Sequence, residues 1–434
     1  MHSASLSRRQ FIQVAATSSM SAALVSPLHA QDAVLARTQL AGQVKSTDDN
    51  AALSNVHAEL FDTYEVERLN KILTTELAEF SDFAISYPPA QVGVNLYRIT
   101  YPSVVPEKNN RPTMASGLIA VPEDATGVLP VVMYQHGSVF GKEDVPSFPE
   151  NSTETRLMIA NFAGQGYLVV AADYFGKGRS PEPNSYIVKP STQQACFDML
   201  SAAQAVSVDL GIEFGPLFLS GWSQGGWSAL VFLNRLESVG IPVTAAAIAS
   251  GPPDLYAMVN RWANNWQAVD AVYIPPLIAI MLHAFEAYYA LPGFTTTAIK
   301  PEYQQVAQEL YTNARTFEEV EAEFPARLPD MLQAEFMAAV ATGDDRFSQL
   351  LQASHGYRWR MKTPVRVYHG GIDEVTPAYI GQLPVGYQQS IGGAEVTSVD
   401  AGDSADHRGV FLYAIANQKQ WFDACGASGA PASK

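Results

Sequence analysis

The chain has 434 residues, of which 47% are apolar and 16% are charged, so it can bury a large core. Its formal net charge is -16, which excludes the basic surface that nucleic acids or anionic lipids bind through charge. We therefore expect neither of these partners. The length would fit two or three average domains, but one α/β core with an inserted segment fits as well, and the order of the elements favours the second.

The first 30 residues predict an export signal. Ser7-Arg8-Arg9-Gln10-Phe11-Ile12 has the form of a twin-arginine motif, and a weakly apolar, uncharged run follows it to Leu28-His29-Ala30. Cleavage after this small residue would leave a mature chain that begins near Gln31. We therefore expect the Tat export machinery as a partner and a periplasmic or secreted location.

No later segment is expected to span a membrane. The longest charge-free apolar stretch, 271–285, has 15 residues and contains two consecutive prolines. Residues 31–91 are interpreted as an N-terminal extension, whose polar first part, up to about residue 55, lacks periodicity and should be loosely ordered. The small, polar residues 426–434 should form a flexible tail.

From about residue 92, short apolar runs alternate with helical patterns. An antiparallel pair is expected first, at 94–101 and 116–121. Strands at 129–134, 167–172, 217–221 and 244–250 then alternate with helices at 154–164, 192–210 and 226–236. The continuous apolar run 168–172 is typical of a parallel strand covered on both faces.

This alternation predicts an α/β fold with a mostly parallel, doubly wound sheet, interrupted by a helical cap. The first part of the core is assigned to 92–253, the cap to 254–361, and the second part of the core to 362–425. The second part should contain strands at 364–368 and 395–400 and a last helix at 410–424.

The segment Gly221-Trp222-Ser223-Gln224-Gly225-Gly226 follows a predicted strand directly and opens a predicted helix. A turn this tight strains the serine backbone and needs glycines two residues away on either side, where the backbone and the next helix approach closely. The hydroxyl then projects from the edge of the sheet. We therefore expect Ser223 to be a catalytic nucleophile rather than a serine in a glycine-rich turn.

A serine hydroxyl needs a base, and in hydrolases with this turn the acid and then the histidine follow the serine. His369 and His407 are the two histidines that follow the predicted cap. His369 lies at the end of a predicted strand, where a packing role is expected. His407 lies in a loop after the last strand and is the predicted base, whereas Asp403 and Asp406 beside it are expected to be solvated.

The acid should lie in the loop after the preceding strand, where a carboxylate can orient the imidazole. We expect Asp373 to fill this role, with the adjacent Glu374 as the alternative. Two backbone amides should form the oxyanion hole. Gln224 supplies the first. The turn Gln135-His136-Gly137 at the end of the third strand resembles the His-Gly turn of such hydrolases, and this resemblance implies that Ser138 is the second donor and that His136 holds the turn.

The glycine-flanked Ser223 and the loop His369-Gly370-Gly371-Ile372-Asp373, with Pro377 after it, resemble the α/β-hydrolase superfamily, in particular its secretory lipase and prolyl-oligopeptidase-like branches. The resemblance covers 92–252 and 362–425. The chain lacks the long propeller of the peptidases and shares with the lipases a large insertion before the acid. The resemblance thus implies a serine esterase, and with no zinc, Walker or dinucleotide motif, neither metal nor cofactor is implied.

The leading hypothesis is hydrolysis of carboxylic esters through an acyl-enzyme, with an apolar acyl or alcohol part of a small-molecule or lipid-like ester under the cap. The apolar stretch 272–294, including Ile278 and Leu282, motivates a pocket there, although it would equally form the core of the cap itself. A peptidase or amidase with the same triad and a non-catalytic binding protein remain as alternatives. Cys196 and Cys425 should be unpaired, because their helices are expected on opposite faces of the sheet.

Overall fold

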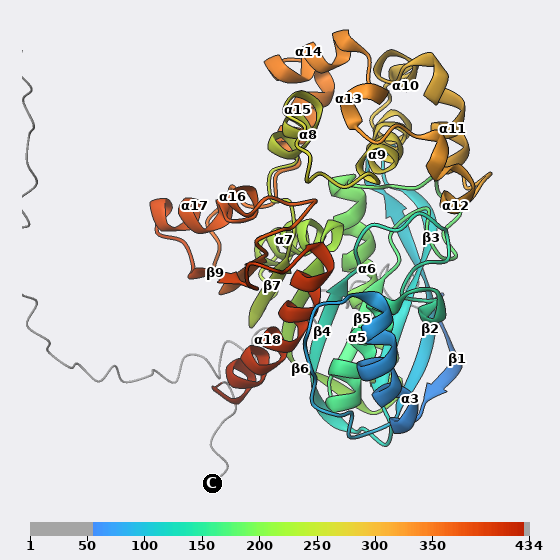
Figure 1. The fold of residues 1–434 in the computed structure, drawn as a ribbon. Helices are drawn as coiled ribbons and strands as arrows, with labels where there is room; N and C mark the ends of the chain where they lie inside the picture. Colours follow the sequence, from blue (N-terminus) through green and yellow to red (C-terminus); the bar gives the residue numbers. More distant parts are fainter. Residues whose placement is uncertain (1–54, 429–434) are drawn as a thin grey trace, which may run out of the picture.

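The computed structural model describes residues 55–428 (Figure 1). Three predicted segments therefore lie outside the described residues, in whole or in part: the export signal with its motif, the start of the extension, and the last six residues of the tail.

A nine-stranded sheet forms the centre of the structure, with the strand order β1-β2-β3-β5-β4-β6-β7-β8-β9. The first strands pair antiparallel, and β4 to β9 are joined by parallel pairs. The strands are β1 (His57–Tyr64), β2 (Val94–Val105), β3 (Arg111–Pro122), β4 (Gly127–Gln135), β5 (Leu168–Ala172), β6 (Ile212–Trp222), β7 (Ala245–Ala249), β8 (Val365–His369) and β9 (Val396–Asp400). The mostly parallel, doubly wound α/β fold is confirmed.

Helices cover both faces of the sheet (Figure 1). On one face pack α6 (Lys189–Asp209) and α7 (Gln224–Ser238), and on the other α5 (Thr153–Phe162) and α18 (His407–Ser428). All five residues of β5 are buried, as expected for a strand covered on both sides. Cys196 on α6 and Cys425 on α18 lie on opposite faces, and both are free thiols.

The N-terminal extension contributes a strand to the sheet, which was not predicted from the sequence. The strand β1 pairs with β2 at the edge, and α3 (Val66–Lys71), the π-helical turn η1 (Ile72–Glu76) and α4 (Leu77–Phe80) follow it. Because β1 is an edge strand with mostly exposed or half-buried side chains, it lacks the apolar run that marks the central strands.

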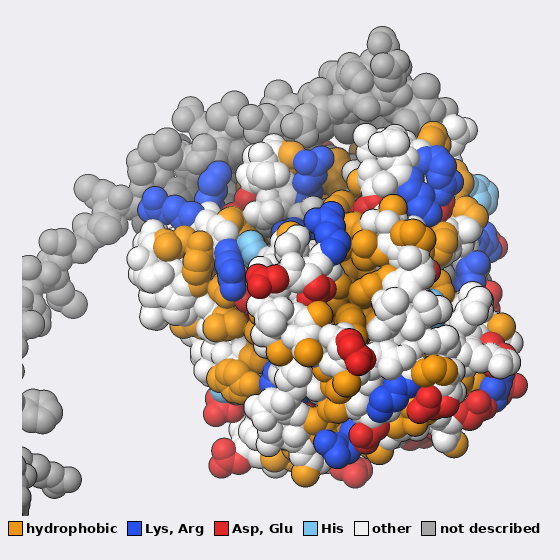
Figure 2. Space-filling view, turned by 90° about the horizontal axis from the view of Figure 1, so that it is seen from above, with side chains coloured by type: hydrophobic (Ala, Val, Ile, Leu, Met, Phe, Trp, Pro, Cys, Tyr) orange, Lys and Arg blue, Asp and Glu red, His pale blue; other side chains and the backbone are white. Residues whose placement is uncertain are grey.

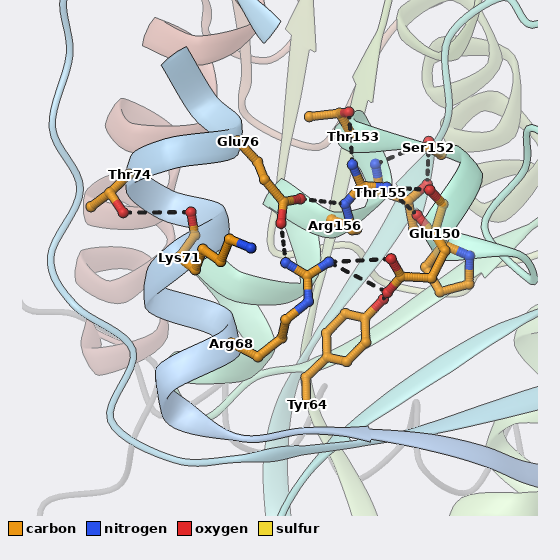
Figure 3. A network of polar contacts seen from close by, with 11 residues as sticks. Tyr64, Arg68, Lys71, Thr74, Glu76, Glu150, Ser152, Thr153, Thr155 and Arg156 are labelled. Atoms are coloured by element: carbon orange, nitrogen blue, oxygen red, sulfur yellow. Dashed lines mark hydrogen bonds and ion pairs between the residues drawn. The ribbon is translucent and has the colours of Figure 1, made fainter. Parts of the chain in front are cut away.

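A polar network ties this extension to the core (Figure 3). Glu76 accepts hydrogen bonds from Arg68 and, at 2.6 Å, from the Nε of Arg156 on α5. Glu150, in the short helix η3 (Pro149–Asn151), accepts from Tyr64 and Arg68. Burial would raise the pKa of Glu76, but its bonds with the two arginines outweigh burial and lower it. The extension is therefore held to the core through ionised groups.

Between β7 and β8 the chain forms the predicted helical insertion, which lies beyond one end of the strands (Figure 1). Its helices are α8 (Leu255–Asn264), α9 (Ile274–Tyr288), α10 (Phe294–Ala298), α11 (Pro301–Tyr311), α12 (Phe317–Val320), α13 (Leu328–Met331), α14 (Ala334–Thr342) and α15 (Arg346–Ala353). Their buried side chains are continuous with the core on the α6 and α7 face. Seen from the cap end, hydrophobic side chains are exposed between charged ones (Figure 2).

Two short helices, α16 (Ala378–Gly381) and α17 (Leu383–Ile391), connect β8 to β9. The last helix, α18, begins at His407, three residues before the predicted start, and runs to Ser428, three residues into the stretch expected to be flexible. The helix starts earlier than predicted because the Asp406 carboxylate accepts the Gly409 amide at 2.7 Å and so caps its N-terminus. Asp406 is thus a helix cap rather than the solvated residue expected.

Candidate active site

Ser223 lies in the turn between β6 and α7, as the sequence predicted. Its φ of 57° and ψ of -122° put it in a region that non-glycine residues rarely adopt. Its amide donates to the Ala249 carbonyl at 2.9 Å, which fixes the turn against β7, and its side chain is half-buried. The structure therefore holds a strained, accessible hydroxyl at the carboxyl edge of the sheet.

The flanking glycines are required by close backbone contacts. A Cβ at Gly221 would lie 2.1 Å from the Gly225 carbonyl oxygen, and one at Gly225 would lie 1.9 Å from the Gln135 carbonyl oxygen. A Cβ at Gly226 would meet the backbone of Gly251 at 2.6 Å. No side chain fits at these distances, so the glycines predicted from the tight turn are confirmed.

The predicted base and acid meet beside this turn. The Nδ1 of His407 lies 2.9 Å from Oδ1 of Asp373, and both side chains are buried. The carboxylate also accepts the amides of Val375 at 2.9 Å and Thr376 at 2.8 Å on Oδ1, and the Ser250 hydroxyl at 2.5 Å on Oδ2. Asp373 is therefore fixed by four donors and faces one ring nitrogen of His407.

Charge stabilises this pair against the cost of burial. Burial alone would raise the pKa of Asp373, but the charge of His407 and the bonds from His407, Ser250 and Thr376 outweigh it and lower the pKa. Burial alone would lower the pKa of His407, but the Asp373 carboxylate outweighs it and raises the pKa above 6.5. The site therefore favours an imidazolium beside a carboxylate, the state a general base reaches when it takes a proton.

Glu374, the alternative acid, makes a different contact. Its Oε2 accepts the backbone amide of His407 at 3.0 Å, and its Oε1 accepts the Tyr273 hydroxyl at 3.1 Å. It therefore contacts the main chain of His407 at the N-terminus of α18, where a negative charge is favourable. The ring of His407 is oriented by Asp373.

Trp222 links the serine turn to the histidine. Its indole Nε1 donates to the His407 carbonyl at 3.0 Å, and the two ring centroids are 5.1 Å apart. Ser223 follows Trp222 directly in the chain, so these contacts bring the predicted nucleophile and base into one site. Among the described residues, no hydrogen bond joins the Ser223 hydroxyl to the imidazole, and such bonds are often long before substrate binds.

The loop after β4 carries the predicted second oxyanion donor. The Gly137 amide donates at 2.7 Å to Glu154 on α5, and the Gly137 carbonyl lies 2.8 Å from Nδ1 of His136. The Ser138 hydroxyl lies 2.7 Å from the Tyr186 hydroxyl. Burial lowers the pKa of His136 to about 4, so this ring is neutral and holds the turn, as predicted. Glu154, Tyr186 and Ser250 were not predicted, because no local motif marks them.

His369, for which the sequence predicted a packing role, has partners other than Asp373 and His407. Its Nε2 lies 2.9 Å from the Ser398 hydroxyl and 2.8 Å from the Gln382 side-chain nitrogen. These partners belong to β9 and to the residue before α17, so the structure agrees with a packing role.

The cap reaches the site at two places. Tyr273, just before α9, contacts Glu374, and Phe317 on α12 stacks on Phe140 of the loop after β4, with ring centroids 3.9 Å apart. Ile278 and Leu282, expected to line an acyl pocket, are only 1% and 0% exposed and belong to the large hydrophobic core. For these two residues the structure favours the alternative, a packing role within the cap.

A cavity of about 660 Å³ opens beside the acid and histidine loops. Residues 78–84 of the N-terminal extension form one wall, and the other includes Ile372, Ala401, Ser404, Asp406 and Arg408. Arg408 donates to the Phe80 carbonyl at 3.0 Å, and Phe80 packs edge-on against Trp222. The extension therefore forms part of the surroundings of His407.

Within residues 55–428, no helix is long and apolar enough to cross a membrane. In the same part of the chain, no three His, Cys, Asp or Glu side chains are grouped so that they could hold a metal ion.

The fold and the arrangement of Ser223, Asp373 and His407 define the class of the protein as an α/β hydrolase. The sequence profile of the family Serine aminopeptidase, S33 (Hydrolase_4) matches residues 146–380, which is more than half of the chain. The chain belongs to this family. The matched region includes Ser223 and Asp373 and ends before His407. No curated protein matches the chain in sequence.

Solved structures share the fold at low sequence identity. A Legionella pneumophila protein described as a hydrolase is 22% identical, with a TM-score of 0.75 over 87% of this chain and 99% of its own. The rice cell wall degrading esterase LipA from Xanthomonas oryzae is 20% identical, with a TM-score of 0.70 over 86% and 96%. Candida antarctica lipase A is 15% identical, with a TM-score of 0.61 over 78% and 79%. The predicted α/β-hydrolase fold is confirmed.

Proposed function

We propose that the protein is a serine hydrolase that cleaves carboxylic esters through an acyl-enzyme. The observation that carries the proposal is the buried Asp373–His407 pair, 2.9 Å apart, next to a strained Ser223. Nδ1 of His407 is bonded to Asp373, which leaves Nε2 to take a proton. This is the arrangement that a serine nucleophile needs at neutral pH.

The proposed reaction has two halves. The Ser223 oxygen attacks the ester carbonyl carbon while its proton passes to His407, and the resulting tetrahedral intermediate expels the alcohol, which takes that proton. Water then attacks the acyl-enzyme, His407 again accepts and returns a proton, and the carboxylic acid leaves. Asp373 stays ionised and stabilises the imidazolium in both halves.

The negative oxygen of each intermediate would be bound by the Gln224 and Ser138 amides. Gln224 is the first residue of α7, so its amide has no acceptor within the helix and lies at the positive end of the helix dipole. The Gly137 amide is already bonded to Glu154, which leaves Ser138 as the next amide in that loop. Each donor should contribute about 3 kcal/mol to stabilisation of the transition state.

The preference for esters over amides is supported by two neighbours in structure, one named an esterase and one a lipase. The family description, serine aminopeptidase, favours an amide substrate instead. Turnover of p-nitrophenyl esters should therefore be compared with that of the matched p-nitroanilides, with the Ser223→Ala variant as the control for each. Higher kcat/KM for the anilides would replace the proposal by the peptidase alternative.

A non-catalytic binding protein would keep the fold without the chemistry. A fluorophosphonate probe should label the purified protein at Ser223 and leave Ser223→Ala unlabelled. An unlabelled wild-type protein would favour this alternative.

We further propose that the cap covers an apolar acyl or alcohol part of the ester. The support is its contact with both sides of the site, through Phe317 at the loop of Ser138 and through Tyr273 at the loop of Asp373.

Export through the twin-arginine route to the periplasm or beyond is proposed from the sequence motif at Arg8 and Arg9. Fractionation of cells that express the chain with and without an Arg8→Lys and Arg9→Lys pair would test it.

A further inference from the structure

We propose that Glu154 is a positioning residue that sets the geometry of the oxyanion loop, defined as residues 136–141. It would act by holding the Gly137 amide, so that the next amide, that of Ser138, is presented to the substrate. This inference rests on the proposed esterase function, and it adds a residue outside the predicted triad and oxyanion hole.

Glu154 lies in the first turn of α5 and is only 5% exposed. Its Oε1 accepts the Gly137 amide at 2.7 Å and also the Tyr134 hydroxyl. The fit is close, because a Cβ at Gly137 would lie 3.1 Å from Oε2 of Glu154 and 3.0 Å from the Trp222 ring. A buried carboxyl group is costly without such bonds, so its place between α5 and the loop indicates a specific use.

The contacts of Glu154 and His136 fix two consecutive peptide planes. Glu154 holds the N–H of Gly137, and Nδ1 of His136 lies 2.8 Å from the carbonyl of the same residue. Because a trans peptide is planar, with its N–H directed opposite to its C=O, fixing the Gly137 carbonyl also fixes the direction of the Ser138 N–H. The oxyanion donor is thus oriented by groups that do not themselves touch the substrate.

The rest of the loop is anchored on its other side. Nζ of Lys177 donates to the carbonyls of Phe140 at 2.8 Å and Gly141 at 2.9 Å, and Tyr186 contacts the Ser138 hydroxyl. These bonds fix where the loop goes after Ser138 but leave the Gly137 amide to Glu154. Loss of the Glu154 acceptor should therefore release the peptide plane of the Gly137 amide, and with it the adjoining plane that carries the Ser138 N–H, without releasing the whole loop.

The charge of Glu154 is not essential to this role. Burial raises its pKa to about 7, opposed by the bonds from Tyr134 and Gly137 and by the charge of His407. Oε1 can accept the Gly137 amide in both the ionised and the protonated acid, and the carboxamide oxygen of glutamine can do the same. A glutamine should therefore preserve the function, whereas a residue of similar size without an acceptor should not.

The test compares Glu154→Gln with Glu154→Leu in the full chain. Both are also made in a Tyr134→Phe background, so that the phenol is not left without a partner, and Tyr134→Phe alone is the matched control. The measurements are kcat and KM for a p-nitrophenyl ester, with active sites counted by complete fluorophosphonate labelling and folding followed by thermal unfolding.

We expect Tyr134→Phe and Glu154→Gln to stay within about 3-fold of wild-type kcat per active site. Glu154→Leu should lose about 10- to 100-fold in kcat with little change in KM, because the oxyanion forms only in the transition state. A purely structural role would instead lower the thermal midpoint and the number of active sites and leave kcat per active site unchanged, which would overturn the inference.

The two proposals fail in different ways. If the wild-type protein hydrolyses no ester and Ser223 is not labelled, the proposed function fails. If the wild-type protein is an active esterase and Glu154→Leu keeps its kcat per active site, or if Glu154→Gln loses as much as Glu154→Leu, only the role of Glu154 is wrong.

Discussion

Replacing Asp373 by asparagine separates the charge of the acid from its hydrogen bonds. Oδ1 of Asp373 faces three N–H donors, from His407, Val375 and Thr376, whereas Oδ2 faces only the Ser250 hydroxyl, which can rotate and accept. The asparagine should therefore place its oxygen at the Oδ1 position. This would keep the hydrogen bond from Nδ1 of His407, so the tautomer survives and the negative charge alone is lost.

The size of the effect follows from the separation of the charges. At an effective dielectric constant of about 20, two unit charges 3 to 4 Å apart interact by about 4 to 6 kcal/mol. Each 1.36 kcal/mol is a factor of ten in rate, so complete loss would cost about 10³- to 10⁴-fold. Because the neutral amide still accepts the hydrogen bond, we expect kcat of Asp373→Asn to fall by about 10³-fold.

The assay is ester turnover as a function of pH. His407 acts as a base only when neutral, so kcat/KM should rise with pH through its pKa, which Asp373 raises above 6.5. In Asp373→Asn that pKa falls, and the acidic limb of the profile should move to lower pH. Glu374→Gln is the control, because it keeps an acceptor for the His407 amide and should cost only about 2- to 5-fold. A larger loss in Glu374→Gln than in Asp373→Asn would show that the acid is misassigned.

Four further outcomes are expected. Ser223→Ala should stay folded and lose measurable ester turnover, and retained labelling by a phosphonate would refute its role as nucleophile. Titration of the denatured, unreduced protein should find two thiols. In the native protein only the half-buried Cys425 should react quickly with the thiol reagent, because Cys196 is fully buried and donates a hydrogen bond to Gln135. Phe317→Ala should raise the transition-state free energy for long acyl esters by about 1 to 3 kcal/mol, which lowers their kcat/KM, and should leave kcat/KM for acetate esters nearly unchanged. Equal losses for both kinds of ester would count against an apolar site beside this ring. Glu76→Gln should destabilise the protein by about 1 to 3 kcal/mol in urea unfolding, and an unchanged midpoint would show that the network in Figure 3 contributes little.

The parts of the site that the sequence predicted are those that the local backbone dictates. Gly221, Gly225 and Gly226 are required by contacts of the turn with its neighbouring segments, so they stand close to Ser223 in the chain as well as in space. Asp373 and His407 could be placed because each follows a strand at the same edge of the sheet. Whether the His407 ring pairs with Asp373 or with Glu374 depends on the directions of the two side chains. The sequence does not show which of two adjacent acidic residues faces the ring.

The parts that were missed depend on contacts between distant residues. Ser250 holds Asp373 across 123 positions of sequence, and a serine after an apolar strand carries no sign of this use. The strand β1 was missed because its side chains are exposed at an edge, although it completes the sheet. Asp406 could have been recognised as a helix cap, because aspartate is a preferred N-cap residue and the apolar helical pattern begins a few residues after it; α18 would then have been predicted to start at His407.

Glu374 is bonded both to the cap and to the predicted base, so the position of the inserted helices is coupled to that of His407. Its backbone carbonyl accepts the Ala271 amide at 3.0 Å and its Oε1 accepts the Tyr273 hydroxyl, so it holds the chain that leads into α9. Its Oε2 holds the His407 amide at the start of α18. A displacement of the start of α9 would therefore act on the residue that fixes the backbone of His407, while Asp373, held by Ser250 and two amides, keeps the ring in place. The two adjacent carboxylates thus hold different parts of His407, since Glu374 accepts its amide and Asp373 faces its ring.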